Sequence, residues 1–269
     1  GERFAFGKNW SRWLSSLTEQ RIEIAGQRMH EMLAGGGLTG LTGKTFLDIG
    51  SGSGIHSLVA FRSSCSRVVS IDYDEDSVAC TTHLRRGYAG DSPSWSVLQG
   101  SALDGNFLDG LGKFDIVYSW GVLHHTGDQW TALDLASQRV NPDGFLFIAL
   151  YNDQGRSSQR WLLVKKMYNL LPRALRWLVL YPSFVRLWAP TLLRDLLRGR
   201  PGKTWRDYRE NRGMSPWTDV VDWVGGLPFE VSRPEEVLRF LRQRGFELAE
   251  MKTCGGGLGC NEFVFRRKK

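Results

Sequence analysis

The fold is decided by residues 46–54, which read FLDIGSGSG. The apolar residues on either side of Asp48 are typical of a parallel strand that is covered on both faces. Glycine at every second position from Gly50 lets the backbone come close to a ligand, because no Cβ stands in the way. Backbone N–H groups at the start of a following helix favour an anionic or polar group. The stretch therefore predicts a buried strand, a ligand-binding loop and a helix.

The spacing of the loop separates it from the dinucleotide fingerprint, which is G-x-G-x-x-G. Here Asp48 stands two residues before Gly50, and Gly52 and Gly54 follow. A pyrophosphate does not require that carboxylate, whereas a ligand with a cationic amino-acid end does. The pattern resembles motif I of the class I S-adenosylmethionine (SAM)-dependent methyltransferases. The resemblance implies SAM as cofactor, with Asp48, Gly50, Ser51, Gly52 and Gly54 beside its methionine part.

Two further segments resemble the parts of the family that bind the ribose and adenine of SAM. Asp72 ends an apolar stretch 22 residues after Gly50, and a carboxylate there can accept both ribose hydroxyls. Tyr73 is a candidate for the adenine face, although a tyrosine at a strand end also serves packing. In the family, the turn after the third strand wraps the adenine, which implicates Ser101 and Ala102. An acidic residue is usual where Ser101 stands, so this chain departs from the pattern there.

The fourth strand, residues 114–119, leads into a turn that carries two histidines. Residues 120–128, WGVLHHTGD, resemble motif IV of the ubiquinone-pathway and natural-product O-methyltransferase branch. The resemblance places Ser119 and Trp120 at the cofactor and one histidine at the acceptor. An imidazole with a pKa near 6.5 suits a general base.

Side chains of adjacent residues diverge on a helical start, so we expect only one of His124 and His125 to face the acceptor. We favour His125, with Asp128 to orient it; the alternative is that a histidine caps the next helix or fills space. Tyr151, Asn152 and Trp10 are further candidates for acceptor contacts.

Strand-like and helical segments alternate from residue 45, and the last two strands suit an antiparallel pair. The predicted fold class is α/β, a Rossmann-like doubly wound sheet that is mostly parallel with an antiparallel final strand, plus a helical insertion after the fifth strand. The predicted division is a helical lid segment at 1–43, a SAM-binding core at 44–155, a basic tryptophan-rich acceptor cap at 156–230, and a closing helix and strands at 231–269.

The positive charge is concentrated in one segment. Residues 156–212 hold 14 Lys or Arg against three acidic residues, a net charge of +11, so the rest of the chain carries −4 of the total +7. Three interpretations stay open: the solvated backs of a helical cap, a site for an anionic membrane surface or a lipid-linked or phosphorylated acceptor, and a nucleic-acid surface. No RNA-binding module or base-methylation motif accompanies the third.

Composition narrows the remaining classes of protein. Hydrophobic content of 42% and charged content of 23% are ordinary for a globular chain. The four cysteines form no C-x-x-C pair, and no metal-binding constellation is present. The beginning of the chain does not resemble a signal peptide, and no apolar run reaches the ~18 residues of a membrane span. We expect a cytoplasmic protein, with peripheral membrane association as the variant that the basic segment allows.

These patterns predict a SAM-dependent methyltransferase that O-methylates a small-molecule or glycan-like acceptor by direct in-line transfer. N-methylation of a small molecule uses nearly the same framework. RNA or protein methylation through the basic segment is a second alternative, and a non-catalytic SAM-binding module is a third. Neither the acceptor nor the oligomeric state follows from the sequence.

Overall fold

The computed structural model describes residues 17–212 and 216–269, and these divide into two compact units. A core unit comprises residues 17–154 and 230–269. A helical unit comprises residues 155–212 and 216–229. Residues 1–16 of the predicted lid segment 1–43, including Trp10, lie outside the described residues.

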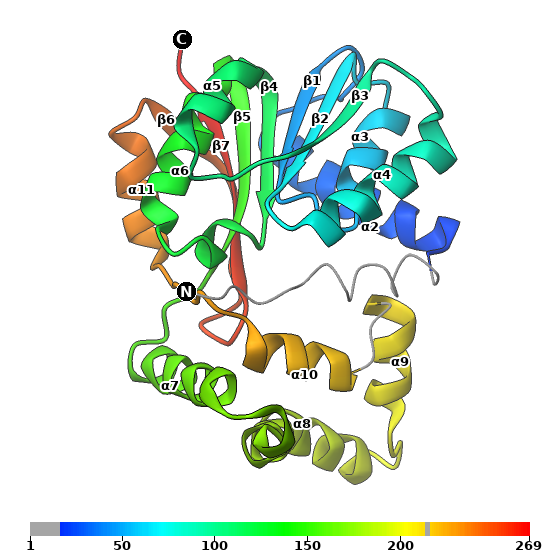
Figure 1. The fold of residues 1–269 in the computed structure, drawn as a ribbon, viewed down its shortest axis with the longest axis vertical. Helices are drawn as coiled ribbons and strands as arrows, with labels where there is room; N and C mark the ends of the chain where they lie inside the picture. Colours follow the sequence, from blue (N-terminus) through cyan, green and yellow to red (C-terminus); the bar gives the residue numbers. More distant parts are fainter. Residues whose placement is uncertain (1–16, 213–215) are drawn as a thin grey trace. The chain divides into compact units, whose positions relative to one another are not determined.

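The core unit alternates strands and helices along the chain (Figure 1). In chain order its elements are α2 (Glu19–Gly35), β1 (Thr45–Ile49), α3 (Ile55–Arg62), β2 (Arg67–Asp72), α4 (Glu75–Ala89), β3 (Trp95–Gln99), α5 (Gly105–Leu111), β4 (Phe114–Trp120), the 3-10 turn η1 (Leu123–His125), α6 (Gln129–Gln138), β5 (Val140–Tyr151), α11 (Pro234–Arg242), β6 (Phe246–Lys252) and β7 (Cys260–Arg267).

The seven strands form one sheet in the order β3-β2-β1-β4-β5-β7-β6. Strands β3, β2, β1, β4 and β5 run parallel to one another, and β7 lies antiparallel between β5 and β6. The predicted fold class is thereby confirmed. Strand order reverses between β1 and β4, and ligands of doubly wound sheets bind outside the carboxyl ends of the strands at such a switch point. The glycine loop after β1 and the turn after β4 both start from this edge.

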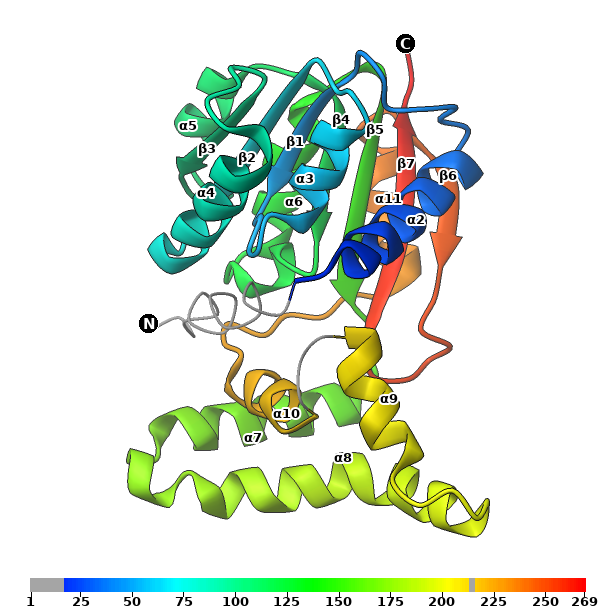
Figure 2. The same cartoon turned by 90° about the vertical axis from the view of Figure 1, so that its right-hand side faces the viewer.

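Helices cover both faces of the sheet, which explains why the central strands are apolar throughout. Figures 1 and 2 show α2, α3 and α4 on one face and α5, α6 and α11 on the other. The largest apolar cluster joins the strands to this second layer through residues such as Leu108, Leu133 and Val237. Each fully buried side chain of this size contributes roughly 1.5–3 kcal/mol relative to exposure.

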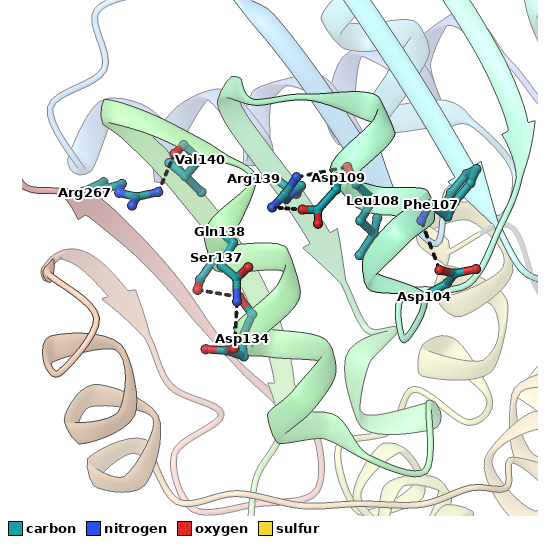
Figure 3. Close-up of polar contacts among 10 residues, drawn as sticks. All are labelled: Asp104, Phe107, Leu108, Asp109, Asp134, Ser137, Gln138, Arg139, Val140 and Arg267. Atoms are coloured by element: carbon teal, nitrogen blue, oxygen red, sulfur yellow. Dashed lines mark hydrogen bonds and ion pairs between the residues drawn. The ribbon is translucent and has the colours of Figure 1, made fainter.

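Polar side chains tie α5 to α6 (Figure 3). Asp104 caps α5 by accepting a 3.0 Å hydrogen bond from the Phe107 N–H. The buried Arg139, which follows α6, donates to the Leu108 carbonyl at 3.2 Å and forms an ion pair with Asp109. Because the last carbonyls of a helix lack partners within the helix, this guanidinium fixes the end of α5 against the end of α6.

The fifth strand begins at Val140 and contains residues 141–144, NPDG, which are residue types that favour turns. Phe114 pairs with Val140 and Ile116 with Phe145, so β5 has extra residues opposite β4. Asp143 takes a positive φ of 61° inside this irregularity. The turn residues thus form a bulge within the strand instead of ending it.

The helical unit has its own small core. Its elements are α7 (Arg156–Leu170), the 3-10 turn η2 (Arg173–Leu175), α8 (Trp177–Leu197), α9 (Lys203–Arg212) and α10 (Pro216–Gly225). Trp188 is buried near its centre, with the rings of Trp205 and Tyr208 at centroid distances of 5.2 and 5.1 Å. Among the described helices, none is long and apolar enough to cross a membrane.

A lysine is enclosed in this unit. Lys165 of α7 is fully buried, and its ammonium donates to the Trp223 carbonyl. Its Nζ lies 4.4 Å from the ring centroid of Trp223 and 4.7 Å from that of Phe229. Burial lowers the pKa of Lys165 to about 7, because transfer out of water disfavours the charged form.

Candidate active site

The glycine loop folds back over the ends of β1 and β2. The N–H groups of Gly50 and Ser51 both donate to the Ile71 carbonyl, at 2.8 and 3.0 Å. Gly50, Gly52 and Gly54 have φ values of 78°, 54° and 81°, a region that side chains disfavour. The alternating glycines of the sequence are therefore required by the backbone of this turn.

Close packing adds a second requirement at Gly50. A Cβ built on it would lie 2.4 Å from both methyl carbons of Val122. Val122 precedes η1, so the glycine loop and the histidine turn touch each other at the switch point of the sheet. The two sequence motifs, some 70 residues apart, form one site.

The loop is also fastened to α4. The hydroxyls of Ser51 and Thr81 are hydrogen-bonded at 3.0 Å, and the Thr81 hydroxyl also donates to the Gly52 carbonyl at 3.2 Å. All three residues are buried. The Ser51 side chain therefore anchors the loop, while the N–H of Gly52 points to the end of β2.

Asp72 receives backbone donors on both oxygens. Its Oδ2 accepts from the Gly52 N–H and its Oδ1 from the Asp74 N–H, each at 2.9 Å. Each carboxylate oxygen has a second lone pair that can accept another hydrogen bond. Burial raises the pKa of Asp72, and the backbone donors oppose this effect. The group is thus oriented and can accept a pair of hydroxyls.

Asp48 starts a buried chain of hydrogen bonds. Its Oδ2 accepts from the Ser57 hydroxyl at 2.6 Å, Ser57 accepts from Ser70 at 2.6 Å, and Ser70 accepts from the Trp95 indole N–H at 2.8 Å. Burial raises the pKa of Asp48 to about 7, and the nearby charge of Asp72 adds to this rise. The sequence analysis missed these partners, although serines in otherwise apolar segments were a signal.

The other predicted cofactor contacts divide into two groups. Tyr73 and Trp120 are exposed at the ends of β2 and β4, with 58% and 44% of their surface accessible. Ala102 is buried. The hydroxyl of Ser119 donates to the Ile49 carbonyl at 2.9 Å, and that of Ser101 accepts from the Leu103 N–H at 3.1 Å. Both serines therefore use a hydrogen bond to hold the local backbone.

The two histidines of η1 have different environments. His124 is fully buried, its Nδ1 accepts from the Tyr151 N–H at 3.3 Å, and its ring lies 3.8 Å from the Tyr151 ring. His125 is half-buried, with its ring 4.5 Å from that of His124 and edge-on to Tyr151 at 5.3 Å. The acceptor role of Nδ1 assigns the proton of a neutral His124 to Nε2.

Two carboxylates near this turn accept hydrogen bonds from backbone N–H groups. Asp128, expected to orient His125, caps α6: its two oxygens accept from the N–H and hydroxyl of Thr131 at 3.2 and 2.8 Å. Glu230, which the sequence analysis did not single out, accepts from the N–H groups of Gly127 and Gln129 at 3.0 and 3.2 Å. Burial raises the pKa of Glu230.

Asn152 is fixed by the loop between β6 and β7. Its Oδ1 accepts from the Asn261 amide at 3.0 Å, and its own amide donates to the Gly257 carbonyl at 3.4 Å. The side chain is thereby held at the end of β5, next to Tyr151. At one end of this loop, the Cys254 thiol donates to the Gly257 carbonyl at 3.2 Å.

The comparisons with known proteins agree with this architecture. A methyltransferase-domain family model matches residues 17–217. Among solved structures, magnesium protoporphyrin IX methyltransferase from Synechocystis with bound S-adenosylhomocysteine (SAH) is similar at a TM-score of 0.52 and 13% identity, over 93% of this chain and 83% of that one.

Two more structures extend the comparison. An O-methyltransferase family protein from Burkholderia thailandensis gives a TM-score of 0.54 at 13% identity, over all of this chain and 65% of that one. The cyclase SpnF gives a TM-score of 0.50 at 13% identity, over 84% of this chain and 75% of that one. At these identities the likeness shows the fold alone. No curated protein sequence matches the chain significantly.

Fold and site together define a class I, SAM-dependent methyltransferase. The family model covers three quarters of the sequence, and the chain belongs to this methyltransferase-domain family.

The residues present fit the cofactor. Asp72, held by two backbone N–H groups, would accept the ribose hydroxyls, and the Asp48 carboxyl would pair with the cationic amino-acid end. Tyr73 and Trp120 offer exposed rings at the neighbouring strand ends. When bound, SAM supplies an electrophilic methyl group on a sulfonium leaving group.

Proposed function

We propose that this methyltransferase O-methylates a small-molecule or glycan-like acceptor, with His125 as the general base. The observation that supports this proposal is the contrast within η1. His124 is enclosed and its Nδ1 is used by the Tyr151 backbone, whereas His125 is half-buried on the same turn. That turn adjoins the glycine loop through Val122.

The role of His125 follows from the chemistry of the acceptor. A hydroxyl is a weak nucleophile until its proton is removed, and a positioned base with a pKa near 7 typically contributes 10²–10⁴-fold. In the proposed arrangement, one ring nitrogen of His125 takes the hydroxyl proton. His124 and Tyr151 pack against its ring and limit its orientation. An amine acceptor that is already neutral would not need this base.

The cofactor half of the proposal is tested by titration with SAH. We expect Asp72→Asn to weaken SAH binding by about tenfold or more, because the ribose hydroxyls lose a charged acceptor. Asp76→Asn, an exposed carboxylate in the first turn of α4, is the matched control and should bind SAH like the native chain. Equal affinities for both variants would remove Asp72 from the site.

The acceptor half is tested by screening phenols, carboxylic acids, sugars and amines for SAH release. For the acceptor found, His125→Gln should lower kcat by roughly 10²–10⁴-fold and leave SAH affinity within about twofold. The native kcat/KM should have an acid limb that His125→Gln loses, because a protonated imidazole cannot take a proton. An amine acceptor with kcat unchanged in His125→Gln would instead establish N-methylation without this base.

A further inference from the structure

The outward side of α8 is apolar, which is unusual for a helix of a soluble domain. Its exposed apolar side chains, referred to as the α8 face, are Trp177, Leu178, Tyr181, Val185, Leu193, Leu196 and Leu197. Each is 48–79% exposed. They follow the three- and four-residue spacing of one helix side, while Leu180, Ser183 and Trp188 are buried toward the unit. Figures 1 and 2 show α7 and α10 on one side of α8.

The first half of α8 is also grooved. A shallow groove is lined by Trp177, Leu178, Tyr181, Pro182, Val185 and Arg186. Its walls are almost wholly hydrocarbon, and its single charged residue is a cation. Contiguous apolar patches of this kind mark sites of macromolecular or membrane contact.

Positive charge surrounds the α8 face. Between residues 173 and 203 the chain has seven Lys or Arg and one acidic residue, Asp195. Asp195 is buried, and its carboxylate accepts from the N–H and hydroxyl of Thr204, both at 2.7 Å. Arg186 and Arg194 lie on the helix itself and are exposed. The face therefore presents hydrocarbon with cations and without an exposed carboxylate on α8.

This combination selects among the possible partners. A second copy of the chain would bring its own cationic rim against the first, and the like charges would oppose pairing. Single-stranded nucleic acid is bound by aromatic platforms and cationic grooves, whereas the α8 face is mainly aliphatic. An anionic bilayer satisfies both features, because lipid headgroups pair with Arg and the acyl boundary accepts Leu and Val.

We propose that α8 docks this protein on an anionic lipid surface, lying in the plane of the interface. The apolar side chains of the α8 face enter the boundary between headgroups and acyl chains, and Arg186, Arg194 and their neighbours contact the headgroups. No insertion across the bilayer is involved, which agrees with the lengths and charges of the described helices. The proposal is independent of the acceptor and of His125.

The test is co-sedimentation of the full chain with vesicles. We compare phosphatidylcholine alone with phosphatidylcholine that contains roughly 30% phosphatidylglycerol, at ~0.1 M and ~0.5 M salt. We expect binding to the anionic vesicles only, and weaker binding at the higher salt. Binding to neither vesicle, by protein that binds SAH normally, would overturn the proposal.

Variants locate the surface. Val185→Glu and Leu193→Glu place a charge on exposed positions of the α8 face and should weaken vesicle binding about tenfold or more. Leu258→Glu makes the same change at a residue of the core unit that is 44% exposed, and it should bind like the native chain. Arg186→Ser with Arg194→Ser should reduce binding, while Arg86→Ser, an exposed arginine on α4, should not.

Three results would contradict the assignment. One is equal loss of binding in Leu258→Glu and Leu193→Glu. Another is normal binding by both glutamate variants of α8, because then other residues hold the lipid. The third is a native dimer by light scattering that Val185→Glu dissociates, which would make the α8 face an interface between copies. Circular dichroism and SAH affinity verify that each variant is folded.

Discussion

Asp48 shows how a candidate binding residue can oppose folding. Its carboxylate is buried on the central strand and accepts a hydrogen bond from the Ser57 hydroxyl. Ser57 in turn is linked through Ser70 to the indole N–H of Trp95. These hydroxyls do not compensate for lost water, so burial raises the pKa of Asp48 to about 7. An anion kept in such a place destabilises the protein without ligand, and a cationic ligand group would relieve that cost.

We therefore expect Asp48→Asn to stabilise the cofactor-free protein and to weaken SAH binding. The unfolded carboxyl has a pKa near 3.9 and the folded one about 7, so the unfolded state binds fewer protons between these values. Stability from this group thus falls as pH rises from about 4 to 7 and stays low above. The free energy of unfolding of Asp48→Asn should exceed that of the native chain by about 2–4 kcal/mol near pH 8. This difference should vanish near pH 4. Urea unfolding at several pH values measures it.

Asp115 supplies a control of opposite sign on the adjacent strand. Burial raises its pKa, but donors from Thr45 and Asn141 outweigh this effect, and the net shift is downward. Asp115→Asn should therefore lose stability near pH 8. If both substitutions destabilise the protein equally at that pH, the buried charge of Asp48 is compensated and does not oppose folding.

At the scale of elements, the contact between Gly50 and Val122 joins the cofactor loop to the histidine turn. Gly50→Ala should cost about 2–4 kcal/mol, since it adds a left-handed alanine and an overpacked methyl. It should also weaken SAH binding. The measurement is urea unfolding with parallel SAH titration.

Gly43 allows the two costs to be separated. Its φ is 74°, close to the 78° of Gly50, but a Cβ there would meet nothing within 4 Å. Gly43→Ala should cost only about 1–2 kcal/mol and leave SAH affinity unchanged. Val122→Ala should recover part of the loss in Gly50→Ala, with a coupling of about 0.5–3 kcal/mol. Without that coupling, the clash with Val122 is not what limits position 50.

The enclosed Lys165 gives a prediction for the packing of α7 on α10. Its unfolded pKa is near 10.4 and its folded pKa about 7, so the unfolded state binds more protons between them. Stability should rise with pH across this window, by up to about 1.4 kcal/mol per unit. Lys165→Met should remove the slope and stabilise the protein by roughly 1–3 kcal/mol near pH 7.5, after the loss of the bond to Trp223.

Urea unfolding at about pH 7.5, 8.5 and 9.5 measures the slope. The exposed neighbour Lys166 provides the comparison, since Lys166→Met should keep the native slope. A native slope in Lys165→Met would show that Lys165 stays charged when buried, through the Trp223 carbonyl and the rings of Trp223 and Phe229.

The success of sequence-based prediction depended on how local each feature is. The glycine loop, the strand that ends at Asp72 and the final strands follow from periodicity and turn chemistry within about ten residues. Glu230 could not be found in this way, because its N–H partners Gly127 and Gln129 are about 100 residues earlier. The environment of His124, in the turn after β4, depends on Tyr151 at the end of β5. Such roles are decided by the sheet order.

At the scale of the whole molecule, two hydrophobic cores of unequal size share one chain. The main cluster of the core unit has 22 buried residues, whereas that of the helical unit has five: Tyr168, Leu180, Trp188, Val220 and Val224. The helical unit also includes a buried lysine and an exposed apolar helix side. Because stability from burial scales with apolar area, the helical unit should be the less stable of the two.

We therefore expect unfolding that is not two-state, with the helical unit opening first. Six of the nine tryptophans in the described residues belong to that unit, so tryptophan fluorescence reports mainly on it, while hydrogen exchange of β1 and β4 reports on the core. SAH at a hundred times its Kd should add about 2.7 kcal/mol to the unit that binds it. It should shift the exchange transition of β1 and β4 to higher urea and leave the fluorescence transition nearly in place. Coincident transitions that both move with SAH would show instead that the two units fold as one.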